Sequence, residues 1–222
     1  MPVVPEILKR DNRENALALL RRYFGLDGKP AYSGSRFEAL GGGGDAADVA
    51  DKITAVDIVA LSMLSIAVPG TAALRLLEDD EFVAVTGEYL SKLPTDVDLV
   101  DIDREVLVDG PAASLWRHFR QLDGVGPTTT SKLMARKRPR LIPVYDSVIE
   151  RAFHFENSSG HWEYWHDLLN ADGRRLHTEL LNVRADAGLP EAVSALRVLD
   201  VVVWMGNRRP DEEGEEASLV TA

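Results

Sequence analysis

The stretch LDGVGPTTTSKLMARKRPRLIPVYDSVI, residues 122–149, contains the three features that decide the fold. A Gly-Val-Gly turn leads into a hydroxyl-rich segment, a dense group of cations follows, and Asp146 then stands alone in an apolar setting. Glycine permits backbone angles that are closed to other residues, and Pro127 is preset for the first position of a helix. The stretch therefore predicts a helix ending at Leu122, a tight turn, and a second helix starting near Thr128, which together make a helix–hairpin–helix.

Helical periodicity extends over most of the remaining chain. Further helices are expected over residues 12–24, from Thr54 to before Pro69, and over 71–77, 82–93, 112–122, 147–155, 161–170, 174–187 and 191–205. Only residues 98–108 alternate in the manner of a strand, and one strand makes no sheet. With 222 residues and 45% hydrophobic content, the chain is long enough for one full domain or two small lobes. We predict an all-α, two-lobed fold with a helix–hairpin–helix motif.

The composition divides the chain into three parts. Residues 1–53 hold an N-terminal helix and a glycine-rich irregular segment whose role the sequence does not indicate. Residues 54–209 form the helical core, with the hairpin at 122–127. Residues 210–222 are rich in acids and are expected to be disordered.

Several classes of protein are excluded by the composition. The absence of cysteine rules out disulfides, thiolate metal sites and a cysteine nucleophile, and it suits a reducing cytoplasm. The N-terminal residues have no apolar core of signal-peptide length, and the apolar run 198–205 is too short to span a bilayer. No two histidines in the segment 154–166 have the i, i+4 spacing that prepares a metal site. We expect a cytoplasmic protein with no membrane partner, no metal and no cofactor.

The net charge of −11 is distributed unevenly. Residues 78–109 have a net charge of −9 and residues 210–222 a net charge of −5, so the remaining chain is slightly positive. Within that remainder, five cations and no acid lie between Lys132 and Arg140. The overall negative charge therefore does not exclude a local surface that binds anions.

The turn and the cations predict a site for phosphate. A glycine turn followed by a helix N-terminus aims backbone N–H groups at an anion, and Lys and Arg supply the salt-dependent part of nucleic-acid affinity. The predicted contacts to double-stranded DNA are Gly124, Val125, Gly126, Thr128, Thr129, Lys132, Arg136, Lys137, Arg138 and Arg140. The alternative interpretation is structural, because such turns often only connect helices and cations complement the dipole at a helix end.

Residues 111–155 resemble the helix–hairpin–helix DNA glycosylases, the base-excision-repair superfamily of endonuclease III and the alkyladenine-type enzymes. The segment LDGVG resembles the Leu-Pro-Gly-Val-Gly hairpin of that superfamily, with Thr129 in the first turn of the next helix. Asp146 follows Gly124 by twenty-two positions and begins a segment, up to Arg151, that is similar to the Val-Asp-Thr-His-Val-x-Arg block. The segments YSGSRF and ITAVDIVALSMLS also resemble those of a bacterial family without an assigned activity.

The resemblance implies a chemistry for Asp146. A carboxylate beside the anomeric carbon stabilises the positive charge that develops when an N-glycosidic bond breaks, and the target base is flipped from the duplex. Thr128 stands where lyase members carry a Schiff-base lysine, which implies a monofunctional enzyme. Lys132, one helical turn later, offers an amine near the same place, although a contact with phosphate also explains it. Asp146 is equally suited to cap a helix, and the residues alone leave both roles open.

The sequence thus favours a DNA-binding protein that is a monofunctional DNA glycosylase. One alternative is a non-catalytic module that binds DNA or senses damage. A second alternative is a helical protein with no role in nucleic-acid binding. The base that such an enzyme would remove is not indicated.

Overall fold

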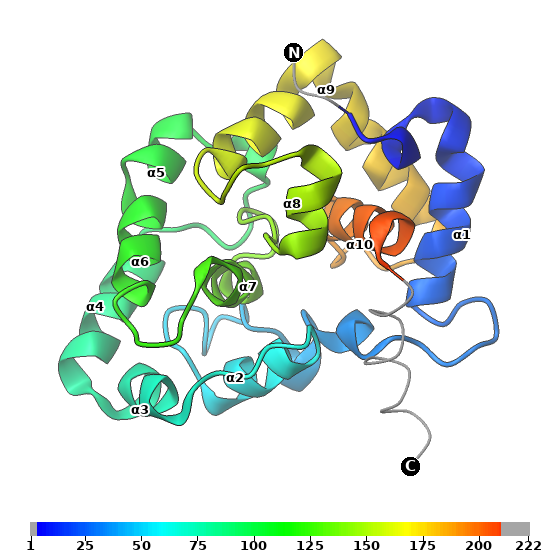
Figure 1. The fold of residues 1–222 in the computed structure, drawn as a ribbon. Coiled ribbons are helices and arrows are strands. Elements are labelled where there is room, and N and C mark those ends of the chain that lie inside the picture. The colour runs from blue at the N-terminus through cyan, green and yellow to red at the C-terminus, as the bar shows by residue number, and fades with distance from the viewer. Residues whose placement is uncertain (1–3, 210–222) are drawn as a thin grey trace.

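The computed structural model describes residues 4–209 and consists of helices and connecting segments (Figure 1). Its α-helices are α1 (Arg13–Tyr23), α2 (Ala55–Ser62), α3 (Gly70–Glu78), α4 (Asp80–Leu90), α5 (Arg104–Val108), α6 (Pro111–Phe119), α7 (Pro127–Lys137), α8 (Ser147–Phe153), α9 (His161–Ala187) and α10 (Ala195–Asn207). No strand occurs within residues 4–209, which confirms the prediction of an all-α protein. The acidic segment 210–222 lies outside the described residues.

The helices pack in two groups that share one hydrophobic core. In one group α4 packs on α3 and α6, α6 packs on α5, and α7 packs on α2 and α6. In the other group α1, α8 and α9 pack against α10, which is coloured orange in Figure 1. The segment between α7 and α8 connects the groups, and α5 contacts α9. Asp146, at the end of that connecting segment, therefore lies where the two groups meet.

The segment with alternating hydrophobicity, residues 98–108, is not a strand. It forms a 3-10 turn at Leu99–Asp101 and the short helix α5. Leu99 donates its N–H to the carbonyl of Arg140 at 2.9 Å, and Leu107 on α5 is fully buried. Because no strand lies beside the segment, a helix satisfies the backbone groups locally. The predicted break in the long C-terminal helical region is confirmed, since residues 171–174 of α9 have non-helical backbone angles.

Two glycines of the irregular segment before α2 are required by close packing. A Cβ on Gly34 would lie 1.9 Å from the hydroxyl of Tyr23, and one on Gly44 would lie 2.5 Å from the carbonyl oxygen of Arg136. The segment ends at Thr54, whose hydroxyl accepts a hydrogen bond from the backbone N–H of Asp57. The carboxylate of Asp57 in turn accepts a hydrogen bond from the backbone N–H of Thr54, which completes a capping box. Thr54 therefore caps α2, at the place where the sequence predicts that a helix starts.

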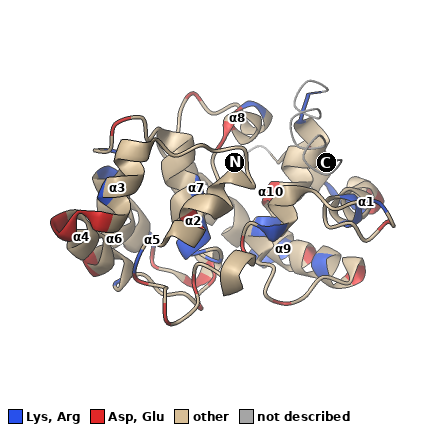
Figure 2. Ribbon diagram, turned by 90° about the horizontal axis from the view of Figure 1, so that it is seen from below, with Lys and Arg blue, Asp and Glu red and all other residues tan. Residues whose placement is uncertain are grey.

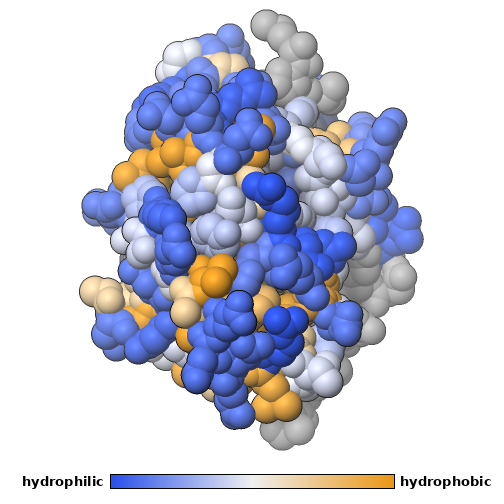
Figure 3. Space-filling view, turned by 90° about the vertical axis from the view of Figure 1, so that its left-hand side faces the viewer, coloured by the Kyte–Doolittle hydropathy of each residue, from blue (hydrophilic) through white to orange (hydrophobic). Residues whose placement is uncertain are grey.

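The surface over the first group of helices is hydrophilic. The acids Asp80, Glu81 and Glu88 lie on α4, where Figure 2 shows a concentration of negative charge. On the face seen in Figure 3, apolar residues form small separate patches rather than a continuous surface. Among residues 4–209, no helix has both the length and the apolar character needed to cross a bilayer.

Candidate active site

Asp146 lies at the start of α8 and caps that helix. Its Oδ1 accepts hydrogen bonds from the backbone N–H groups of Val148 and Ile149, both at 3.0 Å. Its backbone is extended, so the chain turns into the helix immediately after it. The predicted role of Asp146 as an N-cap is confirmed. Because both capping bonds use Oδ1, the second carboxylate oxygen, Oδ2, is not needed for the cap.

Lys132 on α7 approaches that second oxygen. Its Nζ lies 3.5 Å from Oδ2 of Asp146 and donates a hydrogen bond to the carbonyl of Leu64 at 3.0 Å. The side chains of Lys132 and Asp146 are only 8% and 11% exposed, so their charges meet in a largely desolvated place. Lys132 therefore contacts Asp146 and not the outer surface expected of a lysine that binds duplex phosphates.

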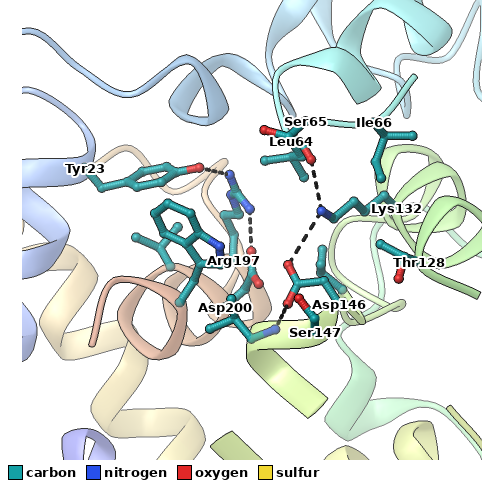
Figure 4. Close-up of a pocket in the computed structure, with 14 residues that line it drawn as sticks. Tyr23, Leu64, Ser65, Ile66, Thr128, Lys132, Asp146, Ser147, Arg197 and Asp200 are labelled. Atoms are coloured by element: carbon teal, nitrogen blue, oxygen red, sulfur yellow. Dashed lines mark hydrogen bonds and ion pairs between the residues drawn. The ribbon is translucent and has the colours of Figure 1, made fainter. Parts of the chain in front are cut away.

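Both residues line a cavity of about 260 Å³. Its walls come from α1, the segment after α2, α7, the first turn of α8, and α10 (Figure 4). The polar side chains in these walls are Tyr23, Thr128, Lys132, Asp146, Ser147, Arg197 and Asp200, with Ser65 in the segment after α2. Val144, Val201 and Trp204 are among its apolar members. Sites for drug-sized ligands have volumes of roughly 300–1,000 Å³, so this cavity is smaller than such sites. It has the size for one small chemical group, such as a single ring.

Arg197 and Asp200, both on α10, also line the cavity, and Figure 4 shows the carboxylate of Asp200 next to that of Asp146. Arg197 donates one hydrogen bond to Oδ2 of Asp200, one to the hydroxyl of Tyr23 at 2.8 Å, and one to the carbonyl of Gly34 at 2.7 Å. Burial raises the pKa of Asp200 to about 6; Asp146 adds to the rise, while Arg197 and Lys132 oppose it. This pair is not among the site residues predicted from the sequence. The available signal was two charges spaced i, i+3 within an otherwise apolar helix.

The cations at the end of α7 do not form a surface for DNA. Arg136, Lys137 and Arg138 are each no more than 1% exposed, and all three donate hydrogen bonds inside the protein. Arg136 binds Asp57 and the carbonyls of residues 37, 38 and 40, while Lys137 binds Asp57 and the carbonyl of Val49. The prediction that Arg136, Lys137 and Arg138 contact DNA phosphate is wrong for this structure.

The reason lies in the irregular segment that precedes α2. Without regular secondary structure, its buried carbonyls need donors, and long cationic side chains supply several at once. Arg138 similarly binds the carbonyls of Ala50, Leu90 and Leu93, as well as Asp51 at 2.7 Å. Burial lowers the pKa of Lys137, and Asp57 opposes that effect. These cations therefore join distant parts of the chain.

Arg140 differs from its neighbours. Its side chain is 33% exposed and pairs with Asp98 at 2.9 Å. Of the cations between Lys132 and Arg140 that were predicted to contact DNA, Arg140 is the one that remains accessible to solvent. Its charge is already balanced by Asp98. Arg140 thus stays a prediction for DNA binding.

Of the residues in and after the turn that were predicted to contact DNA, some are exposed and others are buried. Gly124 is exposed with φ +75°, and Gly126 precedes α7 without any side-chain cap for the helix. Val125 is 2% exposed and packs into the core, and Thr129 is buried as well. Thr128 lines the cavity that holds Asp146. Two helices therefore flank the turn as expected, with α6 ending at Phe119 rather than at Leu122, while its binding of DNA stays a prediction.

In residues 4–209, no group of three or more His, Asp or Glu side chains gathers closely enough to hold a metal ion. The charged groups that line the cavity are instead two acids, Asp146 and Asp200, and two cations, Lys132 and Arg197. Such a set can stabilise a developing positive charge and transfer a proton without a large rearrangement.

A protein-family model matches residues 16–207 of the chain. Its description is a family of unknown function, DUF6308. Comparison with curated proteins and with solved structures found no match. The matched range includes every residue named above in the cavity, so the family model spans the whole candidate site.

Proposed function

We propose that this chain, which belongs to the DUF6308 family of unknown function, is a DNA glycosylase without lyase activity. The observation that carries the proposal is the position of Asp146, whose Oδ2 lies at a cavity beside Lys132 while Oδ1 caps α8. A carboxylate held in this way is fixed in orientation before any substrate arrives. The cavity accommodates one base or sugar, not a duplex, so the target nucleotide must leave the helix stack.

Asp146 is the catalytic residue of the proposed reaction. As the C1′–N bond weakens, positive charge develops on the sugar, and the Asp146 carboxylate stabilises it. The carboxylate then takes a proton from the water that attacks C1′. Lys132 positions the carboxylate from the other side, at 3.5 Å from Oδ2. Thr128, which lines the cavity, provides no amine for a Schiff base, so hydrolysis ends with an intact DNA strand.

Binding of DNA is assigned to the turn before α7 rather than to the buried cations. The first-turn N–H groups of α7 have no side-chain cap, and a helix N-terminus in this state attracts a phosphate. Gly124 and Gly126 let the backbone approach closely, and Gly126 has no atom within 4 Å of the place where a Cβ would be. Because Arg136, Lys137 and Arg138 are buried, we expect affinity for DNA to fall less steeply with salt than five phosphate contacts would require.

The test uses the full-length protein and Asp146→Asn. Asparagine caps a helix about as well as aspartate, so the variant removes the charge and keeps the cap. We expect it to lose base release from modified duplexes while its binding of the same duplexes changes little. Asp101→Asn, at an exposed acid paired with Arg174, is the matched control and should retain activity. Base release by Asp146→Asn at the wild-type rate, or none by the wild type on a broad panel of modified duplexes, would contradict the proposal.

A second candidate is a protein that uses the same cavity for a small molecule and has no role with nucleic acid. The burial of Arg136, Lys137 and Arg138 favours it, because the main predicted DNA-binding surface is absent. A titration of labelled duplex at low and moderate salt separates the candidates. Binding that saturates and weakens with salt supports the glycosylase, whereas no binding at low salt supports the second candidate. Saturable binding with no base release would instead favour a non-catalytic DNA-binding module.

A further inference from the structure

Two acids line the cavity, and the proposed reaction has used only one of them. Asp146 lies at the start of α8, and Asp200 lies on α10 (Figure 4). Arg197 holds Oδ2 of Asp200 through a hydrogen bond. Within the described residues no donor reaches its other oxygen, Oδ1. Asp200 is thus anchored through one oxygen, and the second is available to a ligand in the cavity.

The charges around Asp200 come from four elements and from the irregular segment before α2. Arg197 on α10 and Lys132 on α7 are the cations, Asp146 and Glu38 are the acids, and Tyr23 on α1 shares the Arg197 guanidinium. Asp200 itself is 7% exposed. Burial raises its pKa to about 6 despite the two cations, so a large fraction of this carboxyl group carries a proton near pH 6.

We propose that Asp200 is the general acid that protonates the departing base, and that the enzyme therefore acts on neutral modified bases. This inference rests on the proposed function. The two acids have different roles in the reaction. Asp146 stabilises the positive charge on the sugar and takes a proton from the attacking water, and Asp200 gives a proton to the departing base. Two carboxyl groups in one site can divide the work in this way when their environments differ, so that one donates a proton and the other acts as the base.

The step balances without any further reactant. The carboxyl proton of Asp200 passes to a ring nitrogen or carbonyl oxygen of the base. The C1′–N bond breaks, and its electron pair remains with the base. The oxygen of a water molecule forms the new bond to C1′, and the proton of that water passes to Asp146. Arg197 stabilises the Asp200 carboxylate that results, and exchange of protons with solvent restores both groups.

The same charges determine which bases are accepted. A base made cationic by alkylation departs as a neutral molecule and needs no proton from Asp200. When Asp200 is protonated, such a base also meets two cations, Lys132 and Arg197, which are opposed in the cavity by Asp146 alone. A neutral base gains from the acid and carries no charge that these cations would repel. The inferred substrate class is therefore a neutral modified base, in contrast to the cationic substrates that an alkyladenine-type resemblance would suggest.

Single-turnover base release by the full-length protein tests the inference. The substrates are one duplex with hypoxanthine, a neutral base, and one with 7-methylguanine, a cationic base. On the neutral base, the wild-type rate should fall as pH rises through about 6, because the protonated acid is consumed. Asp200→Asn should lose about 100-fold on this base, within the 10²–10⁴ range of general acids, and should lose the pH dependence. The loss on the cationic base should be at least tenfold smaller.

The outcomes separate this inference from the proposed function. If Asp146→Asn abolishes release while Asp200→Asn keeps both the wild-type rate and its pH profile, the glycosylase assignment stands and the role of Asp200 falls. Equal losses by Asp200→Asn on the two bases would also overturn the role. If the wild type releases neither base nor any other, both proposals fall together.

If Asp200→Asn fails to fold, a ¹³C NMR titration of the carboxyl groups tests the inference without that variant. In the wild-type protein, Asp200 should titrate near pH 6, well above the ordinary range of aspartate. In Asp146→Asn, its pKa should decrease, because the Asp146 charge that raises it is gone. An Asp200 that titrates in the ordinary range, or that does not respond to Asp146→Asn, would overturn the inference without any measurement of activity.

Discussion

Nε of Arg136 on α7 donates a hydrogen bond to Oδ1 of Asp57 on α2 at 3.0 Å, and each side chain is 1% exposed. The two residues are 79 positions apart in the chain. Lys137 binds the other carboxylate oxygen of Asp57 at 3.1 Å, so one acid balances two buried cations. The charges that the sequence suggests for DNA therefore stabilise the junction of α2, α7 and the irregular segment.

Asp57→Asn should be strongly destabilising. The substitution leaves Arg136 and Lys137 without a buried counter-charge, and breaking such a pair costs about 3–5 kcal/mol. Urea unfolding followed by circular dichroism gives the change in free energy of unfolding. Glu88→Gln is the control, because Glu88 and its partner Lys92 are both exposed; it should cost less than about 1 kcal/mol. Equal effects of the two variants would show that the buried network does not stabilise the fold.

Gly44→Ala should also destabilise the protein. The new Cβ would lie 2.5 Å from the carbonyl oxygen of Arg136 and 2.9 Å from Oδ1 of Asp57, so the buried network would have to shift. Overpacking of this kind costs about 1–3 kcal/mol. The comparison is Gly70→Ala, at the start of α3, where a Cβ meets no atom within 4 Å. Thermal unfolding should show a lower midpoint for Gly44→Ala alone, and unchanged stability of that variant would refute the contact.

Stability should fall in acid because of His161, which is 2% exposed. Its Nδ1–H donates to the carbonyl of Ser158 at 2.7 Å, and burial lowers its pKa from 6.5 to about 4. Between these values the unfolded chain binds the proton and the folded chain does not, so stability is lost as pH falls from 6.5 through 4. The full loss is on the order of 3 kcal/mol.

Urea unfolding at pH 7 and pH 5 measures this loss. His161→Phe should reduce the difference between the two pH values, whereas replacement of the exposed His154 by Asn should leave the difference unchanged. An equal pH dependence in wild type and His161→Phe would assign the effect to other groups.

Lys132 should act by positioning Asp146 and not as a nucleophile. Its Nζ is already engaged by the Asp146 carboxylate and by the carbonyl of Leu64. We expect borohydride to trap no covalent complex between the wild-type protein and a substrate duplex, and we expect the product strand to remain intact. Lys132→Gln should slow base release by about tenfold or more, with duplex affinity little changed. A trapped complex that disappears in Lys132→Gln would instead assign a Schiff base to this amine.

Much of the local structure follows from the sequence because its signals are local. Thr54 and Asp146 are recognisable as N-caps from the residue type and the following turn, and both caps form. The turn at Gly124 and Gly126 is recognisable because glycine and proline restrict the backbone in known ways. Residues 98–108 were misread because alternation over a few residues does not reveal whether a partner strand exists.

Only some of the residues that line the candidate site can be predicted from the sequence. Asp146 and Thr128 were found through the spacing of the stretch 122–149, and both line the cavity. Arg197 and Asp200 were missed because an i, i+3 pair on an apolar helix is also typical of a surface ion pair. Only the packing of α10 against α8 brings the pair into the same cavity as Asp146.

The sequence by itself determined that the protein is helical, where most helices begin, and that Asp146 starts one of them, because periodicity, caps and turns act over a few residues. Tertiary structure alone decided that Arg136, Lys137 and Arg138 are buried and that Asp200 lines the same cavity as Asp146. A run of cations has the same sequence whether water or the carbonyls of a distant segment surround it. The physical difference lies in which parts of the chain, far apart in sequence, cover it when the core forms.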